Sequence, residues 1–151
     1  MAKHHLSYVK MQPNNKKEHI NVLFVDDDID FLKSAKQCLK LHGDYDIESA
    51  FSVDEALEKM KKKETDVIVC DIEMPMKNGF EFLKSLRENK NNIPFIVFTV
   101  TEDKQKALRA FTLGANGFVG KAGDPETVFA TLQRCIDKSV NSIEEYNHNN
   151  R

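Results

Sequence analysis

The chain has 151 residues, which is enough for one compact domain with its own hydrophobic core and too few for two ordinary α/β domains. Its 22 basic and 24 acidic side chains are interspersed and give a formal net charge of −2, which argues against a broad nucleic-acid-binding surface. The three cysteines lie far apart inside apolar periodic segments, so we expect reduced core thiols rather than disulfides or a cysteine metal site.

The ends of the chain are polar. Residues 1–19 are rich in Lys, Asn and His and predict a flexible N-terminal tail, followed by one domain over residues 20–141 and a polar C-terminal tail over 142–151. No apolar stretch approaches the roughly 18 residues of a membrane span, and the start of the chain lacks the apolar centre of a signal peptide. We therefore expect no membrane insertion and a cytoplasmic location.

Short apolar runs alternate with segments of helical period along the whole domain. The predicted strands are 20–25, 45–50, 67–70, 95–98 and 117–119. The predicted helices are 29–42, 53–63, a segment around 80–86, 104–113 and 125–141. Strands that are uninterrupted and β-branched are typical of parallel sheets covered on both faces. The pattern therefore predicts an α/β fold with a doubly wound, five-stranded parallel sheet and helices on both faces.

Capping residues support several of these helix boundaries. Asp28 is placed to cap the first helix, and Gly43 is expected to stop it in a left-handed conformation. Ser52 and Glu55 have the spacing of a capping box at the start of the second helix. Gly114 is expected to end the fourth.

Polar residues follow four of the predicted strands. Asp26 and Asp27 follow the first, Asp71 follows the third, and Thr99 and Lys121 follow the fourth and fifth. Because ligands of open parallel sheets bind outside the carboxyl ends of the strands, we expect these side chains to converge on one rim.

The residue types on this rim suit a metal and a phosphoryl group. An aspartate after a strand commonly caps the next helix, but three in succession exceed one cap. Close carboxylates repel one another unless a cation neutralises them, and Mg²⁺ prefers hard oxygen ligands. Beside such a cation, Asp71 could act as a carboxylate nucleophile and form an aspartyl-phosphate. Thr99 or Lys121 alone would be unremarkable, but together they supply a hydroxyl and an ammonium for phosphoryl oxygens.

Four motifs, VLFVDDD, VIVCDIEMPMKNGFEFL, FIVFT and GANGFVGK, carry a specific resemblance. Over residues 21–141 the chain resembles the flavodoxin-like receiver domain of two-component response regulators, the CheY-like superfamily. By this resemblance Asp71 would be the phosphoacceptor. Asp26 and Asp27 would hold Mg²⁺ or Mn²⁺ together with Asp71, and the backbone carbonyl of Glu73 would complete the metal ligands.

The same resemblance assigns a switch. Thr99 would be the switch hydroxyl, Lys121 the ion-pair partner of the phosphate, and Phe118 the switch aromatic, although Phe118 also fits as an ordinary strand residue. The phosphoryl group would come from a histidine kinase or a phosphotransfer protein. The face formed by the fourth helix, fifth strand and fifth helix would then be read by a downstream protein or a second copy of the chain. Such a domain catalyses its own phosphorylation and dephosphorylation, with no turnover of a small-molecule substrate expected.

Two features depart from the family pattern or vary within it. The family's Lys is usually followed by a cis proline, whereas Ala122 follows Lys121 in this chain, and a non-proline cis bond costs about 3 to 4 kcal/mol. The bond is therefore either trans or strained. Glu73 occupies a position that varies in the family, and we hypothesise that its carboxylate partly sets the lifetime of the aspartyl-phosphate.

Three alternatives remain open at this point. A Mg²⁺-dependent phosphatase of the haloacid dehalogenase type also uses an aspartyl-phosphate, but its nucleophile follows the first strand. A nucleotide-binding module is disfavoured because GANGFVGKA lacks the Walker spacing. The chain could also be the receiver part of a larger regulator. It contains no helix-turn-helix pattern or basic recognition helix, so we expect no direct contact with nucleic acid.

Overall fold

The computed structural model describes residues 19–149, and the side chains of residues 19–142. The predicted N-terminal tail therefore lies outside the described residues except for His19. Five parallel strands form one sheet in the order β2-β1-β3-β4-β5, which confirms the predicted fold class. The strands are β1 (Ile20–Val25), β2 (Tyr45–Ala50), β3 (Val67–Cys70), β4 (Phe95–Thr99) and β5 (Gly117–Gly120).

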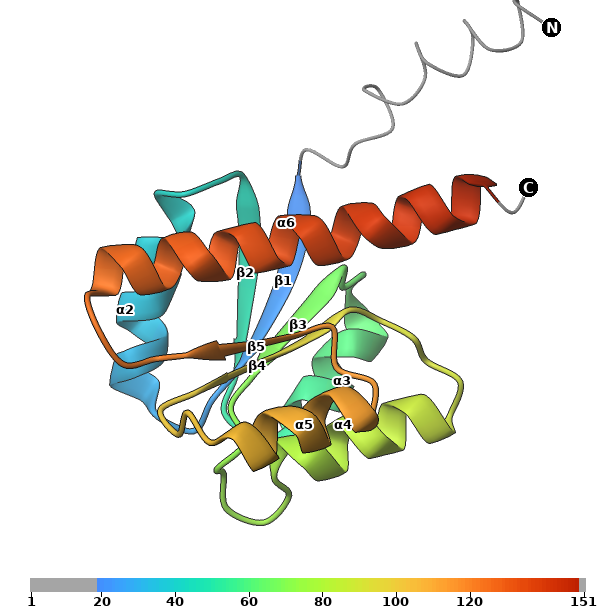
Figure 1. Cartoon of the computed structure of the whole chain (residues 1–151), viewed down its shortest axis with the longest axis horizontal. Coiled ribbons are helices and arrows are strands. Elements are labelled where there is room, and N and C mark those ends of the chain that lie inside the picture. Colours follow the sequence, from blue (N-terminus) through green and yellow to red (C-terminus); the bar gives the residue numbers. More distant parts are fainter. Residues whose placement is uncertain (1–18, 150–151) are drawn as a thin grey trace, which may run out of the picture.

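Helices cover both faces of the sheet (Figure 1). On one face lie α2 (Ile29–Lys40) and α6 (Pro125–Asn149). On the other lie α3 (Val53–Lys62), α4 (Gly79–Glu88) and α5 (Lys104–Thr112). Each face has its own hydrophobic core, because successive strand residues point to opposite sides. In β3, Val67 and Val69 face the α2 and α6 side, whereas Ile68 and Cys70 face the α3, α4 and α5 side.

The first helix starts as predicted but ends differently. Asp28 caps α2, accepting a hydrogen bond of 3.0 Å from the backbone N–H of Phe31. The predicted left-handed stop at Gly43 is wrong, because α2 ends at Lys40 with Leu41 in right-handed helical conformation, and Gly43 has no positive φ. Gly43 instead makes room for the ring of Tyr45, which a Cβ atom there would approach to 2.8 Å.

At the second helix, only one of the two hydrogen bonds of the predicted capping box forms. Ser52 accepts a hydrogen bond of 3.1 Å from the N–H of Glu55, but the Glu55 carboxylate accepts from Phe51 rather than from Ser52. A complete capping box, which was not predicted from the sequence, joins Asn78 and Glu81 at the start of α4. Gly114 ends α5 with a φ of +104°, as predicted.

The last helix is longer than predicted. It was expected to end near residue 141 and give way to a polar tail, but α6 continues to Asn149, and its last turns extend past the sheet in Figure 1. The segment after Pro125 contains no further proline and no glycine, so nothing in it breaks a helix once one has formed. In the described part of the chain, no helix is both long and apolar enough to cross a membrane.

Candidate functional site

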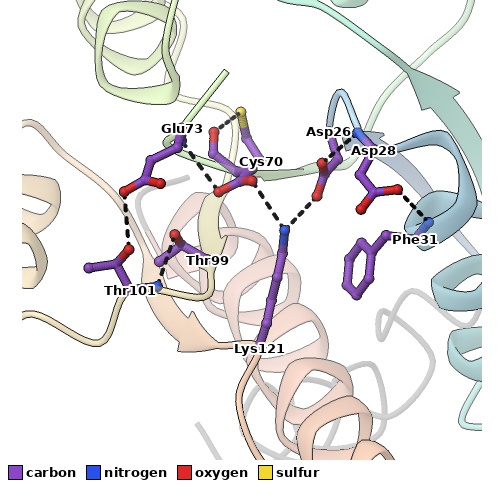
Figure 2. Close-up of polar contacts among 9 residues, drawn as sticks. Asp26, Asp28, Phe31, Cys70, Glu73, Thr99, Thr101 and Lys121 are labelled. Carbon is purple, nitrogen blue, oxygen red and sulfur yellow. Dashed lines mark hydrogen bonds and ion pairs between the residues drawn. The ribbon is translucent and has the colours of Figure 1, made fainter. Parts of the chain in front are cut away.

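The polar residues that follow the strands gather at one rim of the sheet, as predicted (Figure 2). The backbone ladder continues one residue past β1, β3 and β5 and fixes their positions. The N–H of Asp26 donates to Ala50 at 3.0 Å, that of Asp71 to Val25 at 3.0 Å, and that of Lys121 to Thr99 at 2.8 Å. Each side chain therefore leaves a rigid sheet rather than a free loop.

Three carboxylates form a cluster on this rim. One oxygen from each of Asp26, Asp27 and Asp71 lies within 4.8 Å of the others. Asp26 and Asp71 are buried, whereas Asp27 is exposed. Burial raises the pKa of Asp26, against the opposing effects of the Lys121 ammonium and the N–H of Asp28, which donates to it at 3.0 Å. Burial thus disfavours the negative charge on Asp26. A hard divalent cation among these three oxygens would stabilise that charge, so the three carboxylates are suitable ligands for Mg²⁺ or Mn²⁺.

Lys121 joins two of the acids. Its ammonium donates to Asp26 Oδ2 at 2.6 Å and to Asp71 Oδ2 at 3.2 Å. Only 8% of the Lys121 side chain is exposed. Its Nζ atom lies over two aromatic rings, 4.4 Å from the centroid of Phe31 and 5.8 Å from that of Phe98. No role at the site was predicted for Phe31 from the sequence.

Glu73 directs its carboxylate away from the three aspartates. Its Oε1 atom accepts hydrogen bonds of 3.1 Å from Thr101 Oγ1 and 3.1 Å from Lys106 Nζ, in the loop after β4 and the first turn of α5. These two contacts, Lys106 first, lower the pKa of Glu73. Its backbone N–H donates to Asp71 Oδ1 at 3.4 Å. No role at the site was predicted for Lys106, because nothing in the local spacing relates it to Glu73.

The two predicted switch residues differ in burial. Thr99 is fully buried at the end of β4, and its hydroxyl accepts a long hydrogen bond of 3.4 Å from the N–H of Thr101. Phe118 is half-buried and packs on the core below α3, α4 and α5. The bond between Lys121 and Ala122 is trans, since no peptide bond in the described residues is cis.

A family model described as "Response regulator receiver domain" matches residues 22–133. The chain belongs to the receiver domain family of two-component response regulators. This membership agrees with the four motifs of the sequence, and it favours a receiver over the phosphatase and the nucleotide-binding module.

Curated relatives of this receiver are longer regulators, of which it matches only a part. The probable transcriptional regulator ycf29 of Cyanophora paradoxa is 31% identical over 121 residues, covering 79% of this chain and 57% of that protein. The response regulator SaeR of Staphylococcus aureus (strain USA300) is 27% identical over 128 residues, covering 85% and 54%. The chain thus spans about half the length of the curated relatives it matches.

Two solved structures match over nearly their whole length. The chemotaxis response regulator CheY4 of Vibrio cholerae is 35% identical, with a TM-score of 0.68 over 78% of this chain and 98% of that one. The receiver domain of the Francisella response regulator 1452 is 25% identical, with a TM-score of 0.73 over 82% and 98%.

Proposed function

We propose that this receiver accepts a phosphoryl group on Asp71 from a phosphohistidine of a histidine kinase or a phosphotransfer protein. One observation carries the proposal: the Asp71 carboxylate lies beside two further carboxylates and within 3.2 Å of a buried ammonium. This arrangement combines a nucleophile, ligands for a cation and a counter-charge for a phosphoryl group. We further propose that Asp26, Asp27 and Asp71 hold Mg²⁺ or Mn²⁺, with the backbone carbonyl of Glu73 as a fourth ligand.

The transfer itself is a displacement at phosphorus. A carboxylate oxygen of Asp71 attacks in line, the new O–P bond forms, and the electron pair of the breaking P–N bond leaves with the donor's imidazole. When bound, the metal offsets negative charge on the transferred oxygens. The Lys121 ammonium lies next to Asp71 and forms ion pairs with the oxygens of the transferred phosphoryl group.

The output is proposed to be a population shift. Contacts of the phosphoryl group with Thr99 and Lys121 favour one of two arrangements of β4 and β5, and Phe118 moves inward with Thr99. The face formed by α5, β5 and α6 then changes. Two large apolar side chains, Leu108 and Phe111, are 59% and 51% exposed on α5, which supports this face as the surface for a downstream protein or a second copy.

Because the curated relatives are longer, two domain organisations are compatible with this function. The receiver either signals by protein contact alone or forms the receiver part of a longer regulator, and both use the same phosphorylation site. Direct contact with nucleic acid is not proposed for residues 1–151, and the cytoplasmic location stays a prediction.

We also propose that Glu73 tunes the lifetime of the aspartyl-phosphate. Its bonds to Thr101 and Lys106 link the segment after β3 to the loop after β4 and the first turn of α5, next to Asp71. We expect Glu73→Ala to break this link, to give water more access to the aspartyl-phosphate and to speed dephosphorylation by up to about fivefold. Glu88→Ala, an exposed acid at the end of α4, is the control. An unchanged rate of phosphate release would contradict this role.

The first test is the intact mass of the chain after incubation with acetyl phosphate and Mg²⁺. We expect a gain of about 80 Da, the mass of one phosphoryl group, that is absent in Asp71→Asn and after addition of EDTA. Circular dichroism of each sample checks that the fold is intact. A folded wild-type chain that gains no mass, even when quenched within seconds, would contradict phosphoryl transfer.

A further inference from the structure

The ammonium of Lys121 lies against an aromatic face. Its Nζ atom is 4.4 Å from the centroid of the Phe31 ring, and Figure 2 shows this ring beside the Lys121 side chain. The second ring, that of Phe98, is 5.8 Å away and belongs to the strand that ends in Thr99. A cation within about 6 Å of a ring centroid is attracted by the negative face of the ring.

Burial strengthens the attraction between the Lys121 ammonium and the Phe31 ring. An ammonium carries three N–H donors, and the carboxylates of Asp26 and Asp71 accept from it. With 8% of the side chain exposed, little water is left to solvate the rest of the charge. The attraction between a cation and a ring is strongest where water is excluded, so Phe31 replaces part of the lost hydration.

The Phe31 ring is itself held by the fold. It packs edge-on against Phe24 of β1 at 6.4 Å, lies tilted 5.9 Å from Phe98, and stacks 6.5 Å from Phe129 of α6 at an interplanar angle of 27°. Its backbone N–H is fixed in the first turn of α2 by the Asp28 cap. The position of the ring relative to Lys121 is therefore fixed by its contacts with β1, β4 and α6.

We propose that Phe31 is a positioning residue for the phosphoryl group. Its ring face holds the Lys121 ammonium between Asp26 and Asp71, so that this charge is already in place when phosphoryl oxygens arrive. The proposal rests on the proposed function, since the charge is positioned for a phosphoryl group on Asp71. Phe31 itself does not touch the reacting atoms. Without the negative ring face, the long Lys121 side chain would spread over more conformations.

The test separates the effect of the negative electrostatic potential of the ring face from the effect of the ring's shape. Replacing Phe31 by mono-, di- and trifluorophenylalanine withdraws electron density from the ring face and leaves the ring nearly the same size. The same series at Phe24 is the matched control, because Phe24 belongs to the same aromatic cluster and makes no ring contact with a cation in the part of the chain that the structure describes. The readout is the affinity for beryllofluoride with Mg²⁺, a stable mimic of the phosphoryl group, measured by titration.

We expect the affinity to fall stepwise with each fluorine at Phe31, by about tenfold for the trifluoro ring, and to stay constant across the Phe24 series. Phe31→Tyr, which keeps an electron-rich ring, should retain wild-type affinity, and Phe31→Leu should not. A second readout needs no phosphoryl mimic. The ε-methylene protons of Lys121 should show an upfield ring-current shift by NMR in the wild-type protein that disappears in Phe31→Leu.

The outcomes are distinguishable. Equal effects of fluorination at Phe31 and Phe24, or no effect at either, would overturn the role of Phe31 while leaving phosphorylation of Asp71 intact. Ordinary chemical shifts for the Lys121 protons would overturn it as well. A wild-type chain that binds no beryllofluoride and gains no phosphoryl mass would overturn the proposed function, and this inference with it.

Discussion

A Cβ atom on Gly79 would lie 2.4 Å from the backbone carbonyl oxygen of Asp71. The N–H of Gly79 also donates to the carbonyl of Ile72 at 3.0 Å, so the first residue of α4 is held against the chain next to the proposed phosphoacceptor. Gly79 has no positive φ, so this close approach, rather than backbone conformation, explains the glycine.

Gly79→Ala should therefore destabilise the protein. Without a clash, alanine in a helix would stabilise it by up to about 1 kcal/mol relative to glycine, so the sign of the change is diagnostic. A backbone carbonyl cannot rotate away as a side chain does, and we expect a loss of about 1 to 3 kcal/mol in the free energy of unfolding. Phosphorylation from acetyl phosphate should also slow, because Asp71 must shift. Urea unfolding and intact mass check both, and a more stable variant would contradict the close approach.

Thr99→Val should separate phosphorylation from the response to it. Valine has nearly the same shape, and the hydroxyl it removes accepts only a long hydrogen bond, so stability should change by no more than about 1 kcal/mol. Asp71 should still be phosphorylated. The NMR shifts that beryllofluoride causes in α5 and β5 of the wild-type protein should be lost, and Thr99→Ser should keep them. Wild-type shifts in the valine variant would exclude the switch role of Thr99.

Adding Mg²⁺ should stabilise the folded chain, because the carboxylate cluster of Asp26, Asp27 and Asp71 exists only in the folded state. At a hundredfold excess over the dissociation constant, the gain is about 2.7 kcal/mol. Asp27→Asn removes one exposed ligand and should reduce this gain, whereas Asp30→Asn, an exposed acid in the first turn of α2, should not. Thermal unfolding with Mg²⁺ and with EDTA gives the comparison. Equal gains in the two variants would argue against a metal at the cluster.

Tyr45 should make the protein sensitive to alkali. Its hydroxyl donates to Asp137 Oδ1 at 2.9 Å and joins β2 to α6, and burial, followed by the neighbouring Asp137, raises its pKa well above the ordinary value of 10.0. A raised pKa contributes stability that is complete below pH 10 and is lost as the pH rises above it, by about 1.4 kcal/mol per pH unit.

Tyr45→Phe removes this titrating group. At pH 8 the variant should be less stable than the wild type by about 1 kcal/mol through the lost hydrogen bond, and the difference should shrink above pH 10. Urea unfolding at pH 8, 10 and 11 tests this. Stability curves that run parallel over that range would contradict the raised pKa.

Much of the fold and the rim could be predicted from the sequence because both depend on local patterns. Apolar runs such as Val67 to Cys70 identify strands by composition, and the position of Asp71 directly after a run places it at a carboxyl end. Gly43 shows where this reasoning fails. The prediction that Gly43 stops the helix used only the local sequence. In the structure, a glycine is needed there because a Cβ atom would clash with the ring of Tyr45.

The sequence by itself therefore determined the parallel sheet, the order of its elements along the chain and the aspartates, threonine and lysine that meet at its rim. Only the tertiary structure decided that Glu73 pairs with Lys106, 33 residues away, and that the Lys121 ammonium rests on the ring of Phe31. Strand ends are fixed by period and burial, which are written locally in the chain. Contacts between side chains of different loops and helices depend on how those elements pack against one another, and no local spacing encodes that.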